Sequence, residues 1–155
     1  MVERAANLGA VDEPLSVLHT GHHPPGVQLT RFSDRVILVV ADEGLVLDGK
    51  TGRELRDQIS MVIHGPYVVV SDLRGVPFVD RDARALFADD EDGIVLATAV
   101  IAGRDGPIRL LANRWLADNV VTRPVVVFED TEEALAWGHA TAAELRAAGQ
   151  LPEPS

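Results

Sequence analysis

Residues 67–72 read Tyr-Val-Val-Val-Ser-Asp, a mostly β-branched run that ends in a carboxylate. Two apolar runs of the same kind follow along the chain, Ile94–Ile101 and Val125–Phe128. Strands buried on both faces of a sheet have continuous apolar sequences, whereas strands with one face in water alternate apolar and polar residues. The three runs therefore predict parallel strands that lie side by side in the middle of one sheet, with helices above and below.

Segments with helical periodicity separate these strands. The apolar residues of the first segment fall on one stripe, and Asp48 or Thr51 is placed to cap its start. The last segment begins with Asp130-Thr-Glu-Glu133, the pattern of a capping box. Helices are thus expected at Asp48–Ile63, at Asp80–Phe87, at Pro107–Asn119 and from Asp130 to the stop at Gly149.

The segment before the first helix predicts an antiparallel hairpin. Val27–Arg31 and Val36–Val40 have strand composition, and a short turn connects them. A hairpin followed by alternating helices and strands indicates an α/β layer sandwich with a mixed, mainly parallel sheet. We expect a flexible arm at residues 1–16, a single domain at residues 17–149 and a short tail at residues 150–155.

Composition and charge exclude several classes of protein. The chain has 155 residues, 46% of them apolar, which is enough for one ordinary core. It has no cysteine, so neither a disulfide framework nor a thiolate metal site is possible. The net charge of −10 repels a phosphate backbone and argues against nucleic acid as a partner. The sequence shows neither a secretory signal nor an apolar stretch that could cross a bilayer, so we expect a cytoplasmic protein without a membrane partner.

Residues 44–51, Gly-Leu-Val-Leu-Asp-Gly-Lys-Thr, formally match the phosphate-binding P-loop pattern G-x-x-x-x-G-K-[ST]. The match nominates Gly44, Gly49, Lys50 and Thr51 for nucleotide binding. However, the bulky apolar residues between the two glycines prefer extended backbone and burial, whereas a P-loop wraps its amides around phosphate. Carboxylates at positions 42, 43 and 48 also crowd the segment with negative charge. The alternative interpretation is a strand extension that leads into a capped helix.

A second candidate site follows the strand predicted at Tyr67–Ser71. Asp72 and Arg74 lie at the end of that strand and in the loop after it. Asp80, Arg81 and Asp82 begin the next predicted helix, where acidic residues favourably offset the helix dipole. A capped helix after a turn therefore explains most of the pattern, and an interaction loop is the functional interpretation.

No metal or cofactor is predicted. The histidines at positions 19, 22 and 23 form a loop cluster without a clear carboxylate partner. The acidic run at residues 88–93 lacks the alternating ligand spacing of a calcium-binding loop. Both segments are expected to be solvated loops.

Residues 27–140 resemble the small bacterial proteins with a SpoIIAA-like, or STAS/Sec14-like, fold. The matching landmarks are Ser71-Asp-Leu-Arg-Gly-Val76, Asp80–Arg84, the apolar strand that leads to Ile108–Asn119, and Arg123–Phe128 with Thr131–Trp137. The resemblance implies a mixed sheet backed by about four helices, frequent homodimerisation, and no known catalytic residues.

The resemblance also implies a way of binding a protein partner. Anti-anti-sigma factors of this fold dock a partner kinase through the loop after the central strand, where a phosphorylated serine acts as a switch. This chain carries Asp80-Arg81-Asp82 at the corresponding place and has no hydroxyl there. We therefore expect a non-enzymatic regulatory or protein-interaction module that keeps the scaffold and lacks the phospho-switch.

Two alternatives stay open. A Sec14-like carrier of a small apolar ligand or lipid requires a sizeable apolar cavity inside the domain. A nucleotide-binding enzyme requires residues 44–51 to form an anion-binding loop rather than a strand. The interaction module is preferred because the sequence contains no coherent catalytic set.

Overall fold

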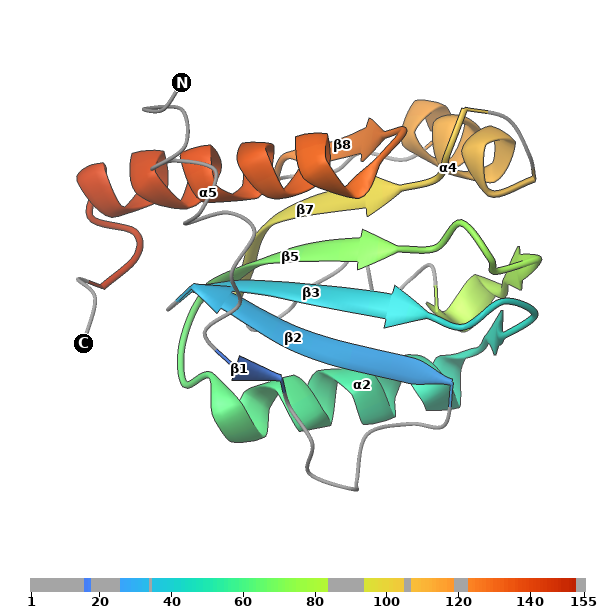
Figure 1. Cartoon of the computed structure of the whole chain (residues 1–155), viewed down its shortest axis with the longest axis horizontal. Helices are drawn as coiled ribbons and strands as arrows, with labels where there is room; N and C mark the ends of the chain where they lie inside the picture. The colour runs from blue at the N-terminus through green and yellow to red at the C-terminus, as the bar shows by residue number, and fades with distance from the viewer. Residues whose placement is uncertain are drawn as a thin grey trace.

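The computed structural model describes residues 16–17, 26–33, 35–83, 94–104, 107–118 and 123–152. Within these residues one sheet consists of β1 (Ser16–Val17), β2 (Val27–Ser33), β3 (Val36–Ala41), β5 (Tyr67–Asp72), β7 (Val95–Ile101) and β8 (Val125–Phe128), in that spatial order. Helix α2 (Gly49–Val62) packs on one face of this sheet, and helix α5 (Thr131–Ala147) packs on the other (Figure 1). The result is the mixed α/β sandwich that the alternation of elements predicts.

The pairing of the strands confirms the predicted mixed sheet. β2 and β3 form the expected antiparallel hairpin, with an irregular register between Arg31 and Ser33. β3, β5, β7 and β8 run parallel to one another. Strand β1 pairs antiparallel with β2 and was not predicted, because a two-residue strand carries no periodic pattern.

The prediction that all three apolar runs lie in the middle of the sheet is wrong for Val125–Phe128. β5 and β7 have a neighbour on each side, whereas β8 is the last strand in the order formed by the described residues. All of its side chains are half-buried, while every residue of β5 is buried. A continuous apolar run indicates that helices cover both faces of a strand, but it does not indicate whether both edges are paired.

The described helices begin where the sequence predicts. The Asp48 carboxylate accepts a hydrogen bond from the backbone N–H of Thr51 at the start of α2, with N and O 2.8 Å apart. At the start of α5, Asp130 accepts from the backbone N–H of Glu133 at 2.9 Å. These side chains satisfy amides that have no partner within the helix. Helix α4 spans Pro107–Asp118 and begins at the proline, as expected.

The predicted helix at Asp80–Phe87 is described only at its start. Residues 81–83 are helical, and the Asp80 carboxylate accepts from the backbone N–H of Ala83 at 2.9 Å. The rest of that helix lies outside the described residues.

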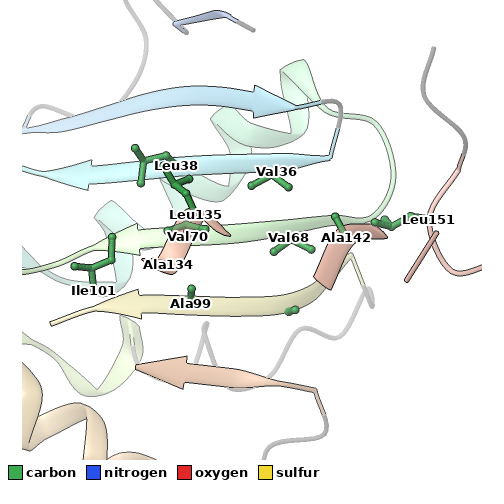
Figure 2. Close-up of a cluster of buried hydrophobic side chains, with 11 residues drawn as sticks. Val36, Leu38, Val68, Val70, Ala99, Ile101, Ala134, Leu135, Ala142 and Leu151 are labelled. Carbon is green, nitrogen blue, oxygen red and sulfur yellow. The ribbon is translucent and has the colours of Figure 1, made fainter. Parts of the chain in front are cut away.

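The core between α5 and the sheet is built around a close helix–sheet contact. A Cβ atom on Gly138 would lie 3.1 Å from Val70 Cγ2 and 3.5 Å from Val36 Cγ1, so α5 approaches β3 and β5 at a residue without a side chain. Buried side chains from α5 and from the parallel strands β3, β5 and β7 belong to one cluster (Figure 2). The cluster comprises Val36, Leu38, Val68, Val70, Ala97, Ala99, Ile101, Ala134, Leu135, Ala142 and Leu151.

Two further clusters fill the opposite face of the sheet, because successive residues of a strand point to opposite faces. Helix α2 places Leu55, Ile59 and Ile63 against the strand residues of that face. The third cluster also contains residues of a separate two-stranded sheet, formed by β4 (Val46–Leu47) and β6 (Phe78–Val79). The small β4–β6 sheet lies at the carboxyl ends of the parallel strands (Figure 1).

Candidate functional site

The loops at the carboxyl ends of the parallel strands bring the two predicted sites together. The backbone N–H of Gly44, after β3, donates to the carbonyl of Gly75, after β5, at 2.7 Å. A Cβ atom on Gly49 would lie 2.7 Å from Asp82 Cβ, so the start of α2 packs closely against the helical turn at residues 81–83. The P-loop-like segment and the candidate interaction loop therefore belong to one surface.

Asp72 and Arg74 form an ion pair that ties this loop to the rest of the domain. The Asp72 carboxylate, on a residue only 8% exposed, accepts from Arg74 Nε at 3.0 Å and from Arg74 Nη2 at 2.7 Å. The backbone N–H of Arg74 also donates to Asp72 Oδ1. Arg74 Nη2 donates in addition to Thr131 Oγ1 at 3.0 Å, at the first residue of α5. The hydrogen bonds to Asp72 raise the pKa of Arg74 above its usual value, and the pair joins the loop after β5 to the start of α5.

The P-loop-like segment does not wrap around an anion-binding space. Gly44 turns with φ of +89°, strand β4 follows in extended conformation, and α2 begins at Gly49. The first turn of α2 already holds the Asp48 carboxylate, because Asp48 caps the helix. The hydrogen bond from the backbone N–H of Thr51 lowers the pKa of Asp48, so this position carries a negative charge at neutral pH. Lys50 is exposed. The geometry agrees with a strand that leads into a capped helix.

The three charged residues after β6 have different environments. Asp80 is half-buried and caps the helical turn that follows it. Arg81 and Asp82 are both exposed. Asp80 thus has a structural role, whereas Arg81 and Asp82 are accessible to a partner.

An exposed apolar pair at this edge was not foreseen from the sequence. In the parallel β4–β6 sheet Val46 lies beside Phe78, and Leu47 lies beside Val79. Alternation directs Leu47 and Val79 into the third core cluster, at 2% and 5% exposure. Val46 and Phe78 point outward at 50% and 48% exposure, and the adjacent Pro77 is also exposed. We call the exposed side chains of Val46, Pro77 and Phe78 the ribbon surface.

The backbone beneath the ribbon surface is held at both ends. At one end, the backbone N–H of Asp80 donates to the Leu47 carbonyl at 2.9 Å. At the other end, the Gly44–Gly75 hydrogen bond joins the loop before β4 to the loop before β6. A Cβ atom on Gly75 would lie 2.7 Å from Glu43 Cα, so this contact requires glycine. The ribbon surface is therefore a preformed feature of the fold.

A cavity of about 30 Å³ lies between α2 and the strands β5 and β7. Leu55, Ile59, Tyr67, Val69 and Val95 provide most of its apolar lining, with the polar residues Ser71 and Thr98 at the strands. A cavity of this size holds on the order of one or two water molecules. It is too small for a lipid chain.

Neither a metal cluster nor a membrane span is found in the part of the chain that the structure describes. No group of three His, Asp or Glu side chains there is placed to hold a metal ion. No described helix is both long and apolar enough to cross a membrane. The histidines at positions 19, 22 and 23 and the acidic run at residues 88–93 lie outside the described residues.

A solved structure shares this architecture. The chain is similar to an uncharacterized protein of the DUF3478 family from Shewanella loihica PV-4, which has a SpoIIAA-like fold. The TM-score is 0.50 at 18% sequence identity, and the match covers 72% of this chain and 91% of that chain. At this identity the likeness shows the fold alone. The protein therefore has a SpoIIAA-like fold, as the sequence resemblance implied.

The sequence also defines a family within that fold. The family model described as a domain of unknown function, DUF7793, matches residues 30–141. The chain belongs to the DUF7793 family. No curated protein matches the sequence.

Proposed function

We propose that this chain is a non-enzymatic regulatory or protein-interaction module that binds a protein partner through the ribbon surface. The observation that carries the proposal is the side-by-side exposure of Val46 and Phe78 on a backbone held at both ends. Exposed apolar patches rimmed by polar residues mark interaction sites on soluble proteins. Aromatic side chains are also enriched where protein interfaces are most deeply buried.

The surroundings of the ribbon surface support an interface. Lys50, Arg81 and Asp82 are exposed charged residues on the two helical turns that follow β4 and β6. They supply a polar rim, and the contact of Gly49 with Asp82 keeps the two turns together. Ligands of α/β sheets bind outside the carboxyl ends of the strands, and the ribbon surface lies at that edge. The resemblance to anti-anti-sigma factors implies docking at the same loop.

The alternatives are not favoured by a specific observation. A lipid or apolar-ligand carrier needs a larger cavity than the one between α2 and the sheet. A nucleotide-binding enzyme needs an open helix N-terminus, and the Asp48 carboxylate fills that position in α2. Homodimerisation and a cytoplasmic location stay predictions.

The test is comparative capture of partners from a lysate of the source organism. Phe78→Ser removes the aromatic ring from the ribbon surface while leaving the buried side chains in place. We expect the immobilised wild-type chain to retain a specific protein and the Phe78→Ser variant to lose at least about 90% of it, a free-energy change of about 1.4 kcal/mol or more.

Met61→Ser is the matched control. Met61 is 59% exposed near the carboxyl end of α2, at the other end of that helix from the ribbon surface. Retention of the partner by Met61→Ser and its loss by Phe78→Ser support the proposal. Equal retention by both variants, or equal loss with both, contradicts docking at the ribbon surface.

A further inference from the structure

We infer that the segment docking on the ribbon surface is a basic polypeptide stretch with apolar side chains. The inference rests on the proposed function and adds the chemistry of the partner. It is drawn from the charges that surround the exposed pair.

Acidic residues outnumber basic residues in the segments that carry the ribbon surface. Eight charged residues lie within four sequence positions of Val46 or Phe78, and five of the eight are acidic. Of the three basic residues, Arg74 is already paired with Asp72 at 2.7 Å. Lys50 and Arg81 are the other two. The five carboxylates belong to Asp42, Glu43, Asp48, Asp80 and Asp82.

Three of these carboxylates are exposed beyond the ends of the β4–β6 pair. Asp42 and Glu43 are exposed in the loop before β4, and Glu43 contacts Gly75 in the loop before β6. Asp82 is exposed beyond the other end of the strands, packed beside Gly49. Arg53 Nη1 lies beside the same glycine, so the end at Asp82 carries charges of both signs, whereas the end at Asp42 and Glu43 is acidic.

This arrangement selects the charge of the partner. Apolar contact with Val46 and Phe78 contributes binding free energy in proportion to the area removed from water. The excess of acidic residues raises the association rate for basic segments and disfavours acidic ones. The net charge of −10 acts in the same direction at longer range, and it also opposes the approach of a second copy of this chain.

Fluorescence-labelled peptides of identical length and apolar sequence provide the test. One peptide carries Lys and Arg at its charged positions, and the other carries Glu. We expect the full chain to bind the basic peptide at least about tenfold more tightly than the acidic one, and this preference to shrink at high salt. Phe78→Ser weakens binding of the basic peptide about tenfold, whereas Met61→Ser leaves it unchanged.

A charge variant tests the rim separately from the apolar pair. Asp42→Asn combined with Glu43→Gln removes two exposed charges and retains the backbone contacts of the loop. This variant is expected to lose several-fold of the preference for the basic peptide while the affinity for the acidic peptide rises.

Three results overturn the inference. They are equal affinity for the two peptides, binding that is insensitive to Phe78→Ser, and Phe78-dependent self-association of the chain in light scattering. If peptide binding shows no charge preference while capture of the lysate partner still depends on Phe78, the partner chemistry is wrong and the docking surface stands. If Phe78→Ser alters neither peptide binding nor capture, both proposals fail.

Discussion

Several charged residues at the carboxyl edge of the sheet make hydrogen bonds within the domain. Asp72, Arg74 and Asp80 were nominated from the sequence as interaction residues, and the structure gives each of them hydrogen bonds within the domain. The sequence indicates a carboxylate at the end of a buried strand. It does not indicate that Arg74 reaches Thr131, which lies 57 residues further along the chain. Contacts across such separations depend on the fold and not on local pattern.

His139 gives a prediction at this scale. It is half-buried on α5, and burial lowers the pKa of its imidazole below the usual 6.5. The folded chain therefore binds a proton at His139 less readily than the unfolded chain does. As a result, His139 does not reduce the free energy of unfolding above about pH 6.5, and it reduces that free energy progressively as the pH falls toward the folded-state pKa. His139→Gln removes the effect.

Urea unfolding of the wild type and of His139→Gln between about pH 7.5 and pH 5 measures this pH-dependent loss of stability. Protonation of carboxylates in acid destabilises the wild type and His139→Gln alike. The informative quantity is therefore the difference between their free energies of unfolding. The wild-type free energy of unfolding should fall more steeply than that of His139→Gln. Parallel pH profiles would show that burial of His139 does not disfavour its protonation.

At the scale of elements, sequence patterns located the long strands and helices well. Caps at Asp48 and Asp130 set the starts of α2 and α5, and apolar runs gave β5 and β7 to within a residue at each end. The short strand β6 was missed, and β4 was expected only in the alternative interpretation of residues 44–51 as a strand extension. Each has two residues, which is too few for a period, and they pair across about thirty residues of intervening chain. The sequence indicates these strands only by two consecutive apolar residues in each.

The contact of α5 with the sheet gives a prediction at the element scale. Gly138→Leu places a side chain where Val70 Cγ2 is already 3.1 Å from an added Cβ atom. Leucine favours the helix by about 0.8 kcal/mol relative to glycine, so any loss of stability reports the packing conflict. We expect the free energy of unfolding to fall by about 1–3 kcal/mol.

Ala140→Leu is the control, because Ala140 is exposed on the same helix. Its stability should remain within about 0.5 kcal/mol of wild type. If Gly138→Leu is as stable as the wild type in urea unfolding, α5 does not approach β3 and β5 as closely as described.

At the scale of the whole molecule, the sequence predicted the layers but not every position within them. Patterns of burial report faces, so the mixed sheet and its two helical layers followed from them. They do not report lateral order, and β8 therefore proved to be an edge strand. The ribbon surface also arises only when the chain folds, because loops after β3 and β5 meet at one edge. Its location at that edge is the central claim for function.

Hydrogen–deuterium exchange of the chain, alone and with the captured partner bound, locates the docking surface. Docking at the ribbon surface predicts that backbone amides of residues 43–50 and 73–82 become protected in the complex, because these segments carry the ribbon surface and its charged rim. Protection confined to the opposite end of α2, around Met61–Pro66, with no change at residues 43–50 and 73–82, would contradict it.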